Sequence, residues 1–96
     1  MQKKTYSNGT HISVTFALNG GNIDGNMENI EIYIKPHTKL RFEEIPQNIK
    51  YAHHIFDGWY CVDTNKVLTE LQIAELVFTT HTTFIALWKT DTSITQ

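Results

Sequence analysis

The chain has 96 residues, of which 41% are hydrophobic and 19% charged, with two prolines and one cysteine. This length fits one domain, and the composition is that of a globular chain rather than a disordered one. The formal net charge of −2 argues against nucleic-acid binding, which needs a concentrated basic surface. No apolar run approaches the roughly 20 residues that cross a bilayer, so this segment is not expected to insert into a membrane.

The N-terminal residues 1–10 are polar and are predicted to form a linker. They lack the apolar stretch of a signal peptide, which leaves open a cytosolic protein and a piece of a longer secreted one. The single cysteine excludes an internal disulfide framework and a multi-cysteine zinc site.

Residues 11–18 alternate between apolar and polar side chains, a pattern typical of a half-buried strand. One face is expected to carry Ile12, Val14, Phe16 and Leu18, and the other His11, Ser13, Thr15 and Ala17. The strand should end at Asn19-Gly20-Gly21, because these residues tolerate the positive φ of a tight turn. A loop is then expected to run to Asn29.

A second alternating strand is predicted over residues 30–35. Its inward side chains would be Ile30, Ile32 and Ile34, and its outward ones Glu31, Tyr33 and Lys35. Pro36 should close the strand, since proline cannot donate to the strand pairing. Further on, Leu40 and Phe42 are compatible with a short strand, and one helical turn could begin at Pro46.

A third strand is predicted over residues 54–62, with apolar side chains on both faces. The two faces would hold Ile55, Trp59 and Cys61 on one side, and Phe56, Tyr60 and Val62 on the other. A polar turn follows at residues 63–66.

The best helix signal starts at Thr69, which has capping-box spacing to Gln72. Apolar residues recur there at helical intervals, at Val67, Leu71, Ala74 and Phe78. A last strand, apolar on both faces, is predicted over 84–88, and a polar tail over 90–96. The sequence therefore predicts an α+β, mainly β fold: a small mixed sheet of about four strands, with one or two short helices and one covered face.

Three sequence blocks carry a resemblance to a known family. They are Val14-Thr15-Phe16-Ala17-Leu18-Asn19-Gly20-Gly21, Phe56-Asp57-Gly58-Trp59-Tyr60 and Thr82-Thr83-Phe84-Ile85-Ala86-Leu87-Trp88. Together they resemble the Listeria–Bacteroides repeat, the internalin B-repeat family, over residues 11–89. The chain departs from the family pattern at His53-His54, where Gly-Tyr is usual, and at Phe84 and Ile85, where Leu and an aromatic are common.

The resemblance implies a β-grasp-like fold, similar to ubiquitin-like modifiers, in a domain spanning residues 11–89. It also implies a place on the bacterial cell surface, outside the cell and within a longer protein. Such modules act as spacers or adhesion domains that contact a protein partner or a neighbouring repeat, without catalysis or cofactor. The motif residues expected to build the domain are Phe16, Gly20, Gly21, Phe56, Gly58, Trp59, Tyr60 and Trp88.

Several residues are candidates for functional sites. Polar and tyrosine side chains on the outer faces of the first two strands form the predicted partner-binding face: Tyr33, Glu31, Lys35, His11 and Thr15. The alternative function is a carbohydrate-binding module that stacks sugars on exposed aromatics, and a small hydrolase built on Cys61 is a third. We favour a core role for the motif aromatics and for Cys61. No metal site is predicted, because the five histidines show no ligand spacing.

Overall fold

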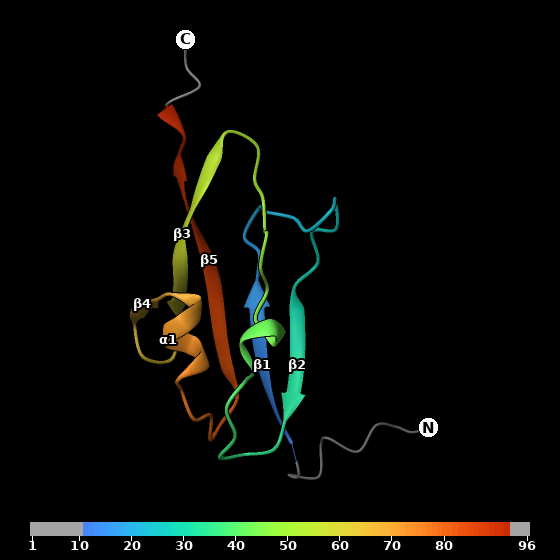
Figure 1. The fold of residues 1–96 in the computed structure, drawn as a ribbon, viewed down its shortest axis with the longest axis vertical. Helices are drawn as coiled ribbons and strands as arrows, with labels where there is room; N and C mark the ends of the chain where they lie inside the picture. Colours follow the sequence, from blue (N-terminus) through green and yellow to red (C-terminus); the bar gives the residue numbers. More distant parts are fainter. Residues whose placement is uncertain (1–10, 93–96) are drawn as a thin grey trace.

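A five-stranded mixed sheet forms the body of the computed structural model, which describes residues 11–92. The strands lie in the order β2-β1-β5-β3-β4 (Figure 1). The predicted linker 1–10 and the tail from residue 93 onward lie outside the described residues. In chain order the elements are β1 (Ile12–Ala17), β2 (Ile30–Ile34), the 3₁₀ turn η2 (Phe42–Glu44), β3 (His54–Cys61), β4 (Lys66–Leu68), α1 (Glu70–Ala74) and β5 (Thr82–Thr90).

The centre of the sheet is the parallel pair of its first and last strands, β1 and β5, with Phe16 opposite Phe84. All other neighbours are antiparallel: β2 on β1, β3 on β5, and β4 on β3. Because β1 and β5 run in the same direction, β1 begins at one end of the sheet and β5 finishes at the other (Figure 1).

The core lies on one face of the sheet, as the alternation in β1 predicts. Val14, Phe16 and Leu18 are buried there, and the half-buried isoleucines of β2 pack beside them. The crossover from β2 to β3 supplies Leu40 and Ile45 to this core, and α1 supplies Ile73. Figure 1 shows this crossover and α1 on the same side of the sheet. The predicted mainly β fold with one covered face is therefore confirmed.

The predicted faces of β3 are right at the end of the strand and wrong at its start. Trp59 and Cys61 are both buried, as their predicted common face requires. Ile55, predicted on the face of Trp59, is 43% exposed, whereas Phe56, predicted on the other face, packs its ring against Trp59 at a centroid distance of 5.3 Å. A β-bulge causes this difference, because the pairing with β5 shifts between Phe56 and Trp59. The extra residue reverses the alternation, so Phe56 and Trp59 share the core face. Gly58 makes the bulge possible with a φ of 118°.

The predicted start of the helix is confirmed, and its predicted buried side is wrong. Thr69 Oγ1 accepts a hydrogen bond from the Gln72 amide, and the Gln72 side chain accepts one from the Thr69 amide, which completes the capping box. However, α1 has only five residues. Leu71 is 70% exposed, Val67 lies in β4 and Phe78 lies beyond the helix. A single turn cannot present four residues of a helical stripe, so Ile73 faces the core instead.

The crossover and the sheet edges also differ from expectation. The predicted strand at Leu40 and Phe42 and the predicted helical turn from Pro46 are replaced by η2, which ends at Glu44 and is followed by Ile45 in an extended conformation. A residue before proline avoids the helical region, which explains this end point. The three-residue strand β4 was not predicted, and β5 continues to Thr90. Among residues 11–92, no helix has the length and apolarity needed to cross a membrane.

We predict that Gly58→Ala destabilises the fold by about 2–3 kcal/mol. The added methyl would lie 2.9 Å from Val67 Cγ1, in addition to the strain of a positive φ. Gly25→Ala is the matched control, because Gly25 has a φ of 89° and nothing within 4 Å of the added methyl. Urea denaturation of both variants measures the difference. Equal losses of stability would show that the contact with Val67 contributes nothing.

Candidate functional site

The structure brings the predicted partner-binding residues together on the outer face of β1 and β2. The strand register places Tyr33 opposite Ser13 and Glu31 opposite Thr15. Tyr33 is 44% exposed, and its hydroxyl donates a 2.9 Å hydrogen bond to Glu31 Oε1. His11 directly precedes β1 and Lys35 directly follows β2, so the same alternation assigns both to this face.

An apolar row continues this outer face across the other strands. The pairing of the strands aligns Ala17, Ile85, Tyr60 and Val67 from β1 to β4. Val67 is 52% exposed, and the other three are half-buried. The sequence shows that the third and last strands carry apolar residues on both faces, but the row itself depends on how the four strands align, which the sequence does not reveal. Among residues 11–92, the covering elements lie on the opposite face.

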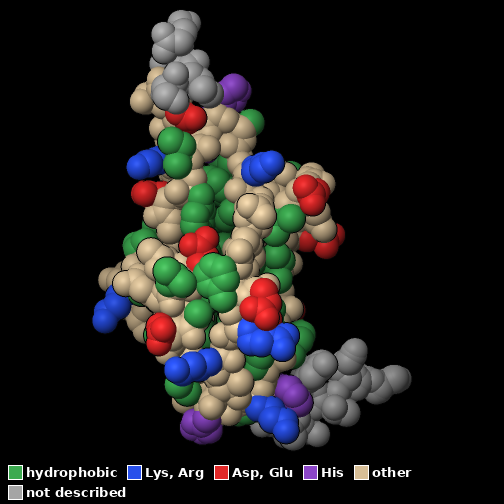
Figure 2. Space-filling model, viewed as in Figure 1, with side chains coloured by type: hydrophobic (Ala, Val, Ile, Leu, Met, Phe, Trp, Pro, Cys, Tyr) green, Lys and Arg blue, Asp and Glu red, His purple; other side chains and the backbone are tan. Residues whose placement is uncertain are grey.

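The motif aromatics lie mainly in the interior. Phe16 stacks on Phe84 with ring centroids 5.2 Å apart and meets the edge of Trp59 at 5.0 Å. All three rings are fully buried. A sugar therefore cannot reach these three rings. Phe56, Tyr60 and Trp88 are only half-buried. Figure 2 shows hydrophobic side chains gathered along the middle of the face that carries α1.

The turn formed by Asn19, Gly20 and Gly21 packs against the indole ring of Trp88. A methyl group on Gly21 would lie 2.3 Å from Trp88 Cζ2, so only glycine leaves room for the indole. The indole Nε1 donates a 3.0 Å hydrogen bond to the Leu18 carbonyl. Gly20 faces Tyr51, with 3.1 Å from its added methyl to Tyr51 Cε2. The first and third sequence blocks thus contact each other directly.

Two side chains extend the pairing of β1 and β5 at its ends. At the start, the Ser13 amide donates a 2.9 Å hydrogen bond to His81 Nδ1. At the finish, the Asn19 amide Nδ2 donates a 2.9 Å hydrogen bond to the Ala86 carbonyl. Both contacts join residues far apart in the chain, so no local sequence pattern indicates them. His81 therefore has a structural contact, a role that the sequence left undefined.

The chemistry-bearing residues are dispersed. Within residues 11–92, no three His, Cys, Asp or Glu side chains gather in an arrangement that could hold a metal ion. The histidines visible in Figure 2 lie near the two ends of the molecule. His54 stacks on Tyr51 at a centroid distance of 4.0 Å, and its Nδ1 lies 2.7 Å from the Ala52 carbonyl oxygen.

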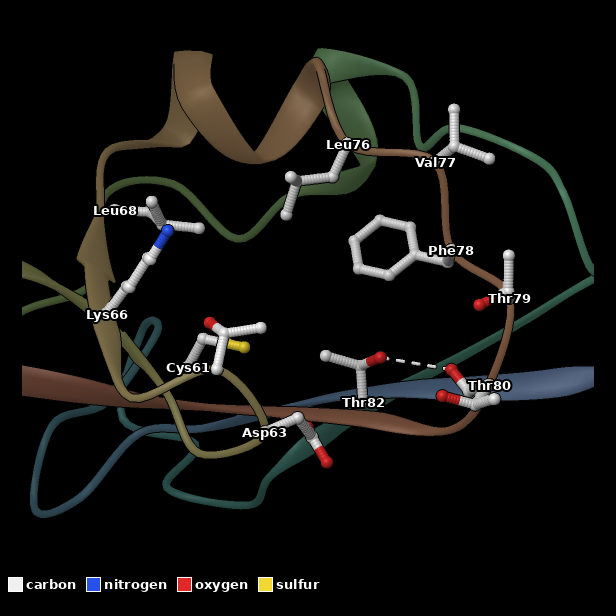
Figure 3. A pocket seen from close by; sticks show the side chains of 11 residues that line it. Cys61, Asp63, Lys66, Leu68, Leu76, Val77, Phe78, Thr79, Thr80 and Thr82 are labelled. Carbon is white, nitrogen blue, oxygen red and sulfur yellow. Dashed lines mark hydrogen bonds between the residues drawn. The ribbon is translucent and has the colours of Figure 1, made fainter.

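A pocket of about 340 Å³ opens beside the hairpin of β3 and β4. Its lining combines apolar side chains with two charged groups and several threonines (Figure 3): Cys61, Leu68, Leu76, Val77 and Phe78 are apolar, and Asp63 and Lys66 are charged. Asp63 Oδ2 accepts a hydrogen bond from the Thr83 amide, which ties the turn after β3 to β5. Within residues 11–92, the ionisable side chains that line the pocket with Cys61 are Asp63 and Lys66, and no histidine is among the lining residues. The apolar part of the lining is suited to an apolar group.

Comparison of the chain with protein-family models, curated proteins and solved structures finds no match.

We predict that Gly21→Ala destabilises the protein by about 1–3 kcal/mol, because the indole of Trp88 must move to admit the methyl group. Trp88→Leu should cost about 2–3 kcal/mol through lost packing and the lost hydrogen bond to Leu18. The double variant should lose less than the sum of the two, because leucine vacates the space that the new methyl needs. A double-mutant cycle by urea denaturation measures the coupling. Strict additivity would contradict a direct contact.

Proposed function

We propose that this chain is a non-catalytic module of a bacterial cell-surface protein, of the Listeria–Bacteroides repeat type. Its role is to space neighbouring domains and to offer its outer sheet face to a protein partner. The observation that carries the proposal is the contact among the three sequence blocks. Asn19 reaches Ala86, Gly21 lies against Trp88, and Phe16 packs on both Trp59 and Phe84. The motif residues thus act as one structural unit.

The sheet topology supports a β-grasp-like fold for this module. A β-grasp sheet places the first and last strands side by side, and β1 and β5 form such a central parallel pair. The crossover with η2 and the short α1 both pack on one face.

The same topology supports a spacer role. Tension applied through the two ends of residues 11–92 would act along β1 and β5 in opposite directions (Figure 1). Separation then requires the hydrogen bonds between the two strands to break together rather than one at a time. The contacts of His81 with Ser13 and of Asn19 with Ala86 lengthen this set of bonds at both ends.

We predict that the module unfolds at high force when pulled from its ends, and that His81→Ala lowers this force. The substitution removes the acceptor of the Ser13 amide, a contact worth about 1 kcal/mol at most in this exposed position. Single-molecule force spectroscopy on a tandem array measures the effect. Leu71→Ala is the control, because Leu71 is exposed on α1 and outside the pairing of β1 and β5. Unfolding at negligible force would contradict the spacer role. A separate measurement, the absence of the parent protein from the surface of intact cells, would contradict the proposed location.

A carbohydrate-binding role stays as a second candidate because of one partly exposed aromatic cluster. Tyr51 is 36% exposed, stacks on His54 and meets the edge of Trp88 at a centroid distance of 5.5 Å. Aromatic rings of this kind can stack on sugars.

If glycans bind at this cluster, cell-wall or host glycans should change the tryptophan fluorescence through Trp88. Tyr51→Ala should then weaken binding roughly tenfold, because it removes one stacking ring. The fluorescence titration measures both effects. Val67→Ala is the control, because Val67 lies on the opposite face of the sheet. A flat titration with the unmodified protein would exclude these glycans as ligands.

A further inference from the structure

The pocket beside the hairpin of β3 and β4 has room for a small organic molecule. Its volume of about 340 Å³ lies within the range of about 300–1,000 Å³ that is usual for small-molecule sites. An apolar cavity of about 150 Å³ is enough to hold benzene. The pocket therefore has space for an aromatic ring and for a polar group beside it.

One part of the pocket is apolar. Cys61 and Phe78 are buried there, and Leu68 and Leu76 are half-buried. Figure 3 shows the side chains of Leu76 and Phe78 pointing into the cavity. Water beside such groups has few hydrogen-bond partners, so an apolar group that displaces this water gains affinity. An aromatic ring suits this part of the pocket, because it can meet the ring of Phe78 edge to face.

A positive charge lies at the side of the same cavity. Lys66 is exposed, lines the pocket, and extends beside Leu68 in Figure 3. The ion pairs within residues 11–92 join Arg41 to two glutamates and Lys89 to Asp57, and none of them involves Lys66. An ammonium group without an acidic partner, next to an apolar surface, is complementary to a ligand that carries a negative charge beside an apolar body.

The carboxylate of Asp63 also lines the pocket and limits the charge that a ligand can carry. Asp63 Oδ2 accepts a 3.0 Å hydrogen bond from the Thr83 amide, and the side chain points away from the middle of the cavity (Figure 3). Within the described part of the chain, Lys66 is the one cationic side chain that lines the pocket. A dianion such as a phosphate monoester would bring a second negative charge near Asp63 without a second cation. A single carboxylate matches the single ammonium group.

We propose that this pocket binds a small aromatic monocarboxylate. The aromatic ring lies against Leu76 and Phe78, and the carboxylate pairs with the ammonium group of Lys66. Thr64 lines the pocket from the turn between β3 and β4, and its hydroxyl can donate a hydrogen bond to the second carboxylate oxygen. This inference does not depend on the proposed surface role.

An NMR titration of the full chain with three related probes tests the proposal. Phenylacetate, phenylacetamide and phenethylamine share the aromatic ring, and they are anionic, neutral and cationic at neutral pH. We expect phenylacetate to shift the backbone amide signals of Thr64, Leu76 and Phe78 in a saturable way, with a dissociation constant in the millimolar range. Phenylacetamide has the shape of phenylacetate without its charge and should bind roughly fivefold more weakly, and phenethylamine more weakly still. High salt should weaken the binding of phenylacetate and leave that of phenylacetamide unchanged.

Three variants identify the groups that bind the carboxylate. Lys66→Gln should weaken phenylacetate binding roughly fivefold and leave phenylacetamide binding unchanged, because it removes the charge and keeps most of the side chain. Lys89→Gln is the matched control, since it makes the same replacement in a strand at a residue that does not line the pocket. Asp63→Asn should strengthen phenylacetate binding about twofold, because it removes a negative charge and keeps an oxygen that can accept from the Thr83 amide. Circular dichroism verifies folding of every variant.

Three outcomes would overturn the proposal. Phenylacetate could leave the amide signals around the pocket unshifted, phenylacetamide or phenethylamine could bind as strongly as phenylacetate, or Lys66→Gln could weaken phenylacetate binding no more than Lys89→Gln does.

Discussion

The indole of Trp59 holds the three central strands of the sheet together. It is fully buried, meets Phe16 of β1 at 5.0 Å and Phe56 of its own strand at 5.3 Å, and lies opposite Ala86 of β5. Its Nε1 finds no hydrogen-bond partner among residues 11–92, which costs about 1–3 kcal/mol. Burying roughly 200 Å² of ring contributes about 5 kcal/mol and outweighs that cost. The position of this ring depends on the bulge at Gly58, so one glycine controls the packing of the core.

The sequence predicts those parts of the fold that depend on neighbours in the chain. The alternation of Ile12, Val14 and Phe16 identifies the buried face of β1, and the spacing of Thr69 to Gln72 identifies the start of α1. Both signals are local. The faces of β3 could not be predicted in the same way, because a bulge appears only when β3 pairs with β5. Strand β4 likewise exists through its pairing with β3, since three residues carry too short a pattern.

The candidate surfaces also divide into features that a local sequence pattern predicts and features that depend on contacts between distant parts of the chain. The face with Tyr33, Glu31 and Thr15 could be predicted from the sequence, because two clean alternations place these residues on one side. The contact of Ser13 with His81 spans 68 positions, and that of Asn19 with Ala86 spans 67. Neither pairing has a spacing rule that could reveal it. The pocket beside Cys61 arises in a similar way, where the β3–β4 hairpin meets the segment of residues 76–82.

A small domain that uses its large apolar side chains for one core has only its outer face, rims and edges left for recognition. Here the covered face is occupied by the crossover and α1, and the deepest aromatic rings are closed to ligands. A spacer role requires only that the central pair of strands resists tension, and this demand falls on β1 and β5. Strand β2 lies outside that pair and carries no part of the load. Side chains on the outer face of β2, such as Glu31, can therefore vary while the hydrogen bonds between β1 and β5 stay unchanged, because recognition and mechanical resistance depend on different groups.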